Sequence, residues 1–500
     1  MSAPHVAVIG GGLAGIAAAL DCADAGARVT LLEVRPRLGG AVYSFERDGL
    51  RIDNGQHVFL RCFTAYRALL ARLGSERGVA LQRRLEIPLV RPGGEVGVLR
   101  RSGLPAPLHL AGTLLRYRHL SLRERLGAAR AALALGRLDP RAPELDRQTL
   151  GAWLAAHGQG PHATAALWDP IALPALNLPA DRASLAQAAF VFKRGLLERA
   201  DAGDIGFHRR PQSEIVGEPA ERALRAAGVD VRLGWRAERV VATEAGIHAP
   251  SVPVSASAGF EVWRRGREAD DEGGRAGGGA AGGEGASVGG DGLDDGRDER
   301  LGADAVIVAL PRTRAAALIE PLDPATAARA LKLHDTPIVN LHVVYDRNVC
   351  EFPFVGGVES PVQYVFDRSD AGGVGEGMQY LAVSLSGADE EMGMSVQELR
   401  ERYLPALAEL FPRARTARVE RFLATREHAA TLRAEPGAGA LRPGPKTAVA
   451  GLALAGAWTD TGWPATLESA VLSGHAAARC ALEAIRLRAG VGARRGGVRP

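Results

Sequence analysis

The feature that most constrains the fold is a glycine-rich turn near the amino end of the chain. The apolar stretch 5–9 (HVAVI) runs into GGGLAG, and the helix-forming stretch IAAALDCADAG follows. This order predicts a dinucleotide-binding unit, because the helix start offers free N–H groups and partial positive charge to a pyrophosphate. Gly10 makes the tight turn, Gly12 lets the phosphates approach, and Gly15 lets the helix pack on the strand. The predicted cofactor-binding residues here are Gly10, Gly12, Leu13, Ala14 and Gly15.

A second strand and an acidic residue follow this turn. Residues 28–32 (RVTLL) are apolar and lead directly to Glu33. A carboxylate at this place accepts hydrogen bonds from both ribose hydroxyls and repels a 2′-phosphate, which leaves NAD or FAD. A second glycine pair follows in RPRLGG, and it resembles the extended flavin motif of the flavin amine oxidase and phytoene desaturase superfamily. The resemblance implies FAD, bound by Glu33, Arg35, Arg37, Gly39 and Gly40.

Composition and charge exclude several other classes of protein. The chain has 500 residues, 46% of them apolar and 24% charged, as in a globular protein of two or three domains. The net charge is +4, but no Lys/Arg-rich block with interleaved aromatics occurs, so we expect no nucleic-acid partner. The four cysteines are scattered without zinc-ligand spacing, which predicts no metal site and fits a cytoplasmic setting. We find no signal peptide and no apolar run of about 18 residues that would span a membrane.

The alternation of strands and helices predicts an α/β fold with a discontinuous cofactor domain. A Rossmann-like FAD-binding domain is predicted from residues 1–80, 205–320 and 440–490. Residues 81–204 and 321–439 are predicted to form a substrate-binding α+β domain. Such an arrangement places the cofactor at a domain interface.

Two segments depart from regular patterns. Residues 264–300 are rich in glycine and charge and poor in apolar side chains, so they are predicted to be a disordered insertion between two strands. The stretch 168-WDPIALPALNLP-179 contains three prolines and is predicted to break the regularity of the helices at 145–200.

Residues 100–137 combine many arginines with many leucines and a single acid, Glu124. A basic, leucine-rich helical segment of this kind binds an anionic membrane surface. The same pattern also fits an ordinary helix pair packed on the core with a solvated arginine face. Both interpretations stay open at this point.

Three stretches narrow the family resemblance. The stretches 52-IDNGQHVF-59, 336-TPIVNLHVVYDR-347 and 455-AGAWTDTGWPATLESAVLSG-474 resemble the hydroxysqualene dehydroxylases, FAD-dependent enzymes of squalene and hopanoid biosynthesis within the same superfamily. The resemblance covers nearly the whole chain except the region around 249–303. Where the superfamily has Arg after the second glycine pair, this chain has Ala41, and Ala457 replaces the Asp of the Ala-Gly-Asp motif. Arg37 and Asp460 are the nearby residues that would compensate.

The resemblance implies a reaction and its partners. It implies that hydroxysqualene loses its hydroxyl as water and accepts a hydride, which yields squalene. NAD(P)H is the implied transient reductant, because the sequence shows no second dinucleotide motif. An apolar isoprenoid substrate, contact with enzymes of the squalene or presqualene synthase type, and a peripheral place at the inner membrane face are the corresponding expectations.

The candidate site residues come from the same motifs. His57 is the first candidate for the acid that assists hydroxyl departure, with Asp53 as its support or as a turn-capping residue. Asp169 and Asp460 are the second choices, and His57 as a simple flavin-contact residue is the alternative. Predicted substrate-lining residues are Gln56, Trp168 and Trp463, and predicted cofactor contacts of the later segments are Val231, Gly456, Trp458, Thr466 and Leu467; Glu468 is expected to orient the last helix.

Three other functions remain open. A carotenoid-type desaturase runs the opposite redox direction on a similar apolar substrate. An amine oxidase uses the same fold but favours a lysine near the flavin, and this chain has lysines only at 193, 332 and 446. A non-catalytic FAD-binding scaffold is consistent with Ala41 and Ala457.

Overall fold

The computed structural model describes residues 3–243, 259–264 and 298–496, and its first layer is a parallel sheet. The strand order is β10-β2-β1-β14-β20, and every neighbouring pair is parallel. The predicted α/β class is confirmed. These strands come from the three predicted cofactor segments: β1 (His5–Ile9), β2 (Arg28–Glu33), β10 (Asp230–Leu233), β14 (Ala305–Val308) and β20 (Leu452–Leu454).

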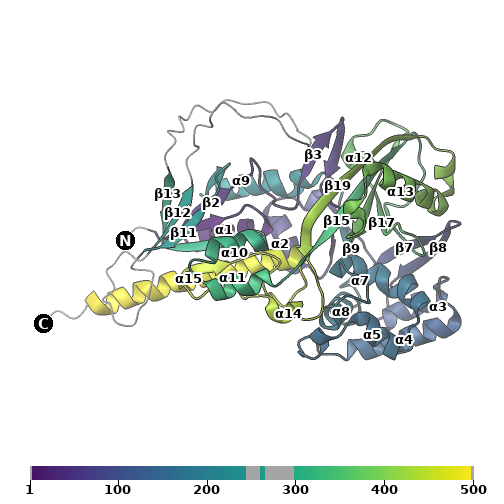
Figure 1. Cartoon of the computed structure of the whole chain (residues 1–500), viewed down its shortest axis with the longest axis horizontal. Coiled ribbons are helices and arrows are strands. Elements are labelled where there is room, and N and C mark those ends of the chain that lie inside the picture. The colour runs from purple at the N-terminus through teal and green to yellow at the C-terminus, as the bar shows by residue number, and fades with distance from the viewer. Residues whose placement is uncertain (1–2, 244–258, 265–297, 497–500) are drawn as a thin grey trace.

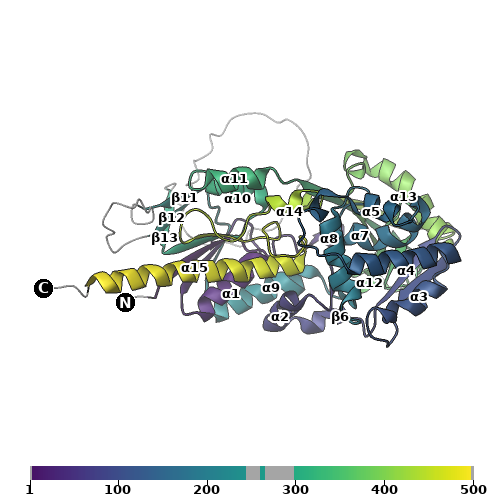
Figure 2. The same cartoon turned by 90° about the horizontal axis from the view of Figure 1, so that it is seen from below.

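Both faces of this sheet are covered, which explains why its strands are apolar throughout. Val6 and Val8 of β1 pack on one face against the helices α1 and α15, whereas Ala7 and Ile9 pack on the other face. Figure 1 shows the long α15 running beside the sheet, and Figure 2 shows α1 and α9 on the same side as α15 and α10 and α11 on the opposite side. The covering elements are α1 (Leu13–Asp24), α2 (Thr64–Arg72), α9 (Glu218–Ala226) and α15 (Leu467–Gly496) on one face, and α10 (Arg312–Ile319), α11 (Pro324–Leu331), β11 (Arg239–Ala242), β12 (Phe260–Arg264) and β13 (Glu299–Ala303) on the other.

The second layer is a seven-stranded mixed sheet with the order β19-β15-β18-β17-β16-β7-β8. All its strand pairs are antiparallel except β16 with β7. Helix α13 (Val396–Leu410) packs on one face of it. The strands come from the two predicted substrate segments: β7 (Glu86–Arg91), β8 (Glu95–Arg100), β15 (Asp335–Tyr345), β16 (Phe354–Gly357), β17 (Tyr364–Asp367), β18 (Gln379–Ser386) and β19 (Val419–Leu432).

A helical layer covers part of the other face of this sheet, at the end of the molecule opposite the chain termini (Figure 1). The predicted break at 168–179 lies at the end of the stretch, where α7 stops at Leu176 and Asn177 takes a left-handed backbone with φ 54°, and not at its first two prolines. Pro170 lies in the first turn of α7, where its missing N–H has no helical partner to lose, and the helix continues through Pro174. The helices are α3 (Ala111–Arg116), α4 (Leu122–Gly136), α5 (Leu150–Ala156), α6 (Pro161–Ala163), α7 (Asp169–Leu176) and α8 (Leu185–Phe192), and the π-helical turn Lys193–Leu197 follows α8.

Short elements connect the two sheets. The hairpin β3–β4 (Ser44–Arg47, Leu50–Asp53) and the three-stranded sheet β5-β9-β6 (Val58–Leu60, Ile205–His208, Val79–Leu81) surround the stretch around His57. Two further helices, α12 (Ser369–Gly372) and α14 (Ala438–Leu441), lie in loops.

The bounds of the predicted insertion need a correction. Arg264 is the last residue of β12 and pairs with Glu299 of β13, because the two strands form an antiparallel hairpin base. Residues 265–297 lie outside the described residues. Among the described helices, none is both long and apolar enough to cross a bilayer.

Candidate functional site

A cavity of about 1180 Å³ joins the two layers. One end touches the glycine-rich turn and the loops after β2, β10 and β14. The other end lies between α7, α8 and the seven-stranded sheet, and it is lined mainly by apolar side chains. This volume exceeds the range of about 300–1,000 Å³ that is typical of a single small-ligand pocket, so the cavity can take a dinucleotide and a second molecule.

The glycine motifs leave bare backbone at the first end of the cavity. A Cβ added to Gly15 would lie 1.8 Å from the carbonyl oxygen of Gly10, so helix α1 packs as closely on its strand as the sequence predicts. Gly40 has φ +59°, and a Cβ there would lie 2.8 Å from the Cα of Gly12. Gly10, Gly12, Leu13, Ala14, Gly39 and Gly40 line the cavity, whereas Gly15 lies behind them.

The start of α1 is built to receive an anion. No side chain caps its first turn, and no acidic residue lies in that turn. The unpaired N–H groups of Leu13 and Ala14 therefore remain available for a pyrophosphate.

Glu33 is oriented by the backbone at the end of β2. Its two carboxylate oxygens accept hydrogen bonds from the N–H groups of Gly11 (2.7 Å) and Arg35 (2.8 Å). Each oxygen keeps a lone pair, and Glu33 lines the cavity, so the carboxylate can also accept from ribose hydroxyls.

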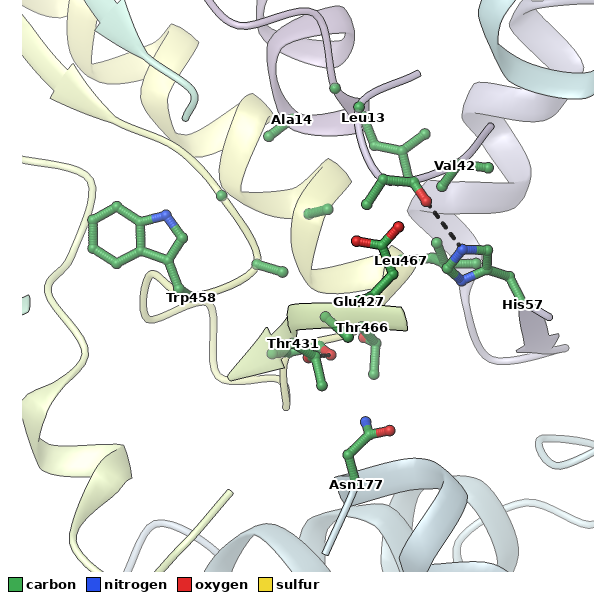
Figure 3. Close-up of a pocket in the computed structure, with 18 of the residues that line it drawn as sticks. Leu13, Ala14, Val42, His57, Asn177, Glu427, Thr431, Trp458, Thr466 and Leu467 are labelled. Carbon is green, nitrogen blue, oxygen red and sulfur yellow. Dashed lines mark hydrogen bonds between the residues drawn. The ribbon is translucent and has the colours of Figure 1, made fainter. Parts of the chain in front are cut away.

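The start of the last helix, α15, faces the same cavity from another side. Thr466 and Leu467 line the wall (Figure 3), and Ala470 also lines the cavity. Nearby, the amide nitrogen of Gln56 is buried without a hydrogen-bond partner, although Gln56 lines the cavity. This end of the cavity combines a glycine cradle, a free helix start, an acidic residue and a buried amide without a hydrogen-bond partner. Together these features fit FAD.

The two arginines near Ala41, Arg35 and Arg37, have different positions relative to the cavity. Arg35 lines the cavity, so it is the arginine placed to replace the one missing at position 41. Arg37 does not line it: its guanidinium lies 3.6 Å from the ring centre of Tyr43 and donates to the Gly40 carbonyl at 3.3 Å. Arg37 therefore supports the second glycine pair from behind, which corrects its predicted cofactor contact.

The loop between β20 and α15 is organised around a buried arginine. The guanidinium of Arg442 donates to the carbonyl oxygens of Ala457 (2.9 Å) and Trp458 (3.3 Å) and to those of Thr459 and Trp463. Burial lowers the pKa of Arg442 to about 10. Gly456, Ala457, Trp458 and Trp463 line the cavity, but Asp460 is exposed and accepts from the N–H of Gly462, so it does not compensate for Ala457.

His57 reaches the cavity from the segment before β5. Its Nε2 donates to the carbonyl oxygen of Ala41 at 3.3 Å (Figure 3), and Nδ1 has no hydrogen-bond partner among the described residues. Burial lowers the pKa of His57 below its usual value of 6.5, against a smaller raising effect of the Ala41 carbonyl. The ring is therefore largely neutral at pH 7, and its acid form belongs to lower pH.

Asp53 does not support His57 as predicted. Its carboxylate forms a buried ion pair with Arg368 at 2.7 Å and accepts from the Ser44 hydroxyl at 2.6 Å and the Gln212 N–H at 3.0 Å. Asp53 does not line the cavity. It joins the β3–β4 hairpin to the second layer, which is a structural role.

Three other predicted site residues lie away from the cavity. Trp168 is buried among the helices, where its indole N–H donates to Gln159 at 3.0 Å and its ring packs edge-on against Phe192. Val231 is buried between the parallel sheet and its helices, and the loop residues 235–238 that follow it line the cavity instead. Asp169 accepts from the N–H of Ala180 at 2.8 Å within the helical layer, and burial raises its pKa.

The sequence reasoning missed Glu427, which lines the cavity from the middle of β19 (Figure 3). Its Oε1 lies 3.4 Å from the Tyr43 hydroxyl and 3.4 Å from Nδ2 of Asn54. The sequence around it does not single it out, because β19 also carries Glu420, Arg421 and Arg426. Glu468, by contrast, is buried and accepts from the N–H groups of Ala65 and Tyr66, so it ties α15 to α2.

Comparisons with known proteins give the family and the fold of the chain. The family model described as "Flavin containing amine oxidoreductase" matches residues 13–265 and 284–482. The chain is 28% identical to the hydroxysqualene dehydroxylase of Rhodopseudomonas palustris, over 96% of this chain and 99% of that protein. It is 26% identical to a probable zeta-carotene desaturase of Synechococcus elongatus, again over 96% and 99%. The solved structure of cyclohexylamine oxidase from Brevibacterium oxydans superposes with a TM-score of 0.65 at 19% identity, over 96% of this chain and 99% of that one. The chain therefore belongs to the flavin-containing amine oxidoreductase family.

Proposed function

We propose that this FAD-dependent oxidoreductase removes the hydroxyl of hydroxysqualene and forms squalene. The observation that carries the proposal is the apolar end of the cavity. It is lined by side chains from α7, α8 and the seven-stranded sheet, which suit a long hydrocarbon chain better than a polar substrate. The apolar lining includes Leu60, Leu85, Ile87, Ile171, Pro174, Phe190, Leu196, Phe354 and Phe366.

The reaction balances as R–OH + H⁺ + H⁻ → R–H + H₂O. Bound FAD, reduced by a transient nicotinamide donor such as NAD(P)H, supplies the hydride. The chain itself excludes water, holds the carbinol carbon between the glycine motifs and the apolar compartment, and places His57 where it can give a proton to the departing hydroxyl. Trp463, packed edge-on against Phe63 and Phe190, closes the wall at the junction.

The lysines argue against an amine oxidase. None of the three lysines of the chain lines the cavity. Lys193 donates to the Leu138 carbonyl at 3.0 Å, Lys446 pairs with Glu483, and Lys332 is exposed. A carotenoid-type desaturase is the second candidate, because the same apolar compartment suits a polyene and a relative of comparable identity carries that name.

A product assay separates these functions. Purified holoenzyme is incubated with hydroxysqualene, zeta-carotene and a long-chain amine, each with reduced and with oxidised flavin. We expect squalene from hydroxysqualene with reduced flavin alone. Desaturated carotene under oxidising conditions, with hydroxysqualene unchanged in both arms, would overturn the proposal in favour of the second candidate.

We further propose that the helical layer rests on an anionic lipid surface at the inner membrane face. Six large apolar side chains between 104 and 133 are exposed, among them Leu115 (61%) and Leu122 (70%). On α4 the exposed leucines share a face with exposed arginines, while Ala128, Ala131 and Leu135 turn to the core. This leucine–arginine face comprises Leu104, Leu108, Leu115, Leu122, Leu126, Leu133, Arg116, Arg118, Arg123, Arg130 and Arg137.

Charge complementarity selects the occupant, because exposed arginines beside exposed leucines fit phosphate headgroups and acyl chains together. Arg125 is left out, since it donates to the carbonyls of Leu115 and Leu120 and holds the helices together. In flotation with vesicles containing phosphatidylglycerol, we expect the protein to float and the L122S/L126S/L133S variant to stay at the bottom. The exposed Leu331 lies elsewhere, so L331S is the matched control. Equal flotation of the triple variant and wild type would contradict this proposal.

A further inference from the structure

Glu427 faces the cavity from the regular part of β19, directly before an irregularity of the strand. In the pairing of β15 with β19, Ile338 lies opposite Glu427 but Thr336 lies opposite Thr431, so one intervening residue on β15 faces three on β19. A bulge of this kind re-aims side chains, and it adds Ala430 to the cavity wall that Glu427, Ala429 and Thr431 line. Regular alternation alone places Glu427 on the same face as Ala429 and Thr431.

The carboxylate of Glu427 lacks a cationic partner. Its contacts are the neutral Tyr43 hydroxyl and the Asn54 amide, both at the long distance of 3.4 Å. Within the described ranges, no Arg, Lys or His nitrogen lies within ion-pair distance of it. This half-buried carboxylate therefore keeps its direct ion-pair position open, which fits a site where a positive charge forms on the substrate.

Arg37 is the permanent charge nearest to Glu427, but its guanidinium stands over the Tyr43 ring, 3.6 Å from the ring centre, and forms no ion pair with Glu427. Burial and the neighbouring Glu427 raise the pKa of Tyr43, which keeps its hydroxyl neutral. His57 is neutral once it has given up its proton, because burial lowers its pKa. Figure 3 shows Glu427 and His57 both directed into the same part of the pocket, below the start of α1.

We propose that Glu427 is a catalytic residue whose carboxylate stabilises the positive charge on the reacting carbon. This role rests on the proposed dehydroxylation. The C–O bond breaks heterolytically, its electron pair leaves with the oxygen, and that oxygen takes a proton from the His57 imidazolium and departs as water. The carbon is left cationic beside Glu427 until it gains the hydride from the reductant named above, so atoms and charges balance. A fixed carboxylate in an apolar cavity stabilises such a charge far more than water does.

A cation mimic tests this role without turnover. The ligand is a squalene analogue with a quaternary ammonium nitrogen at the reacting carbon, and its partner is the neutral analogue with a quaternary carbon there. Binding of both to oxidised holoenzyme is measured by equilibrium dialysis. We expect wild type to prefer the ammonium compound at least about tenfold and E427Q to lose this preference. The control E420Q, on the same strand but exposed, should keep it.

Activity provides the second arm. With hydroxysqualene and reduced flavin, E427Q should lose about 10²–10³-fold in kcat while its flavin spectrum and melting temperature stay those of wild type. An E427Q enzyme that keeps both the ammonium preference and kcat would overturn the role of Glu427. Wild-type enzyme that leaves hydroxysqualene unchanged would instead overturn the proposed function, so the two failures are distinguishable.

Discussion

Nε2 of His57 donates a hydrogen bond to the carbonyl oxygen of Ala41 at 3.3 Å, and this bond ties the ring, which lines the cavity, to the segment that follows the second glycine pair. The bond occupies Nε2 as a donor to Ala41. It leaves Nδ1 free to exchange a proton with a ligand. A residue placed in this way is suited to proton transfer at the junction of the two compartments.

Replacing His57 should therefore remove chemistry and leave cofactor binding intact. We expect His57→Gln, which keeps polarity and approximate size, to lower kcat for hydroxysqualene by about 10²–10⁴-fold. The flavin-to-protein ratio from absorbance should match wild type. Wild-type kcat in His57→Gln would remove His57 from the role of acid.

The pH dependence should reveal the direction of proton transfer. Burial places the His57 pKa below 6.5, and only the imidazolium can donate. Dehydroxylation should then be fastest below that pKa and fall about tenfold per pH unit above it. A desaturase that uses neutral His57 as a base would show the opposite slope.

The same titration needs a stability control. Burial lowers the pKa of His208 to about 3, so this ring contributes stability that is present above pH 6.5 and lost as the pH falls toward 3. Thermal melts across the range therefore identify the pH values at which rates are interpretable.

Asp53 should matter to folding more than to chemistry. Asp53→Asn removes one charge of the buried pair with Arg368, which is 2.7 Å away, and should cost about 3–5 kcal/mol of unfolding free energy. Chemical denaturation measures this loss. The double variant D53L/R368M should recover a substantial part of it, and a D53N protein as stable as wild type would contradict the structural role.

Arg442 should control how firmly the protein holds its cofactor. Arg442→Met leaves the carbonyls of Ala457, Trp458, Thr459 and Trp463 without their common donor, at a cost of about 3 kcal/mol. We expect faster loss of flavin on dialysis, because this loop lines the cavity. As a control, the exposed Arg413 can be changed to Met, with flavin retention unaffected.

The sequence was most informative where backbone geometry follows from local pattern. The spacing of Gly10, Gly12, Gly15 and Glu33 is visible in the sequence itself. It predicted the parallel sheet and the start of α1. The paired carboxylate of Asp53 was not, because Arg368 lies far away in the chain and its position depends on packing of β17 and the following turn.

Aromatic residues and the charged residues of β19 were harder to read. Trp168 and Trp463 look alike in the sequence, but only Trp463 lies at the junction of the two layers. Glu427 is one of several charged residues of β19, and only the packing of β19 on β15 beside the cavity shows which of them faces the site.

A single-turnover experiment tests the proposed dehydroxylation most directly. Holoenzyme is reduced anaerobically, mixed with hydroxysqualene, and followed by flavin absorbance and by product extraction. The proposal predicts that flavin is reoxidised as squalene forms, one molecule for each flavin. Reduced flavin that persists beside unchanged hydroxysqualene would contradict it.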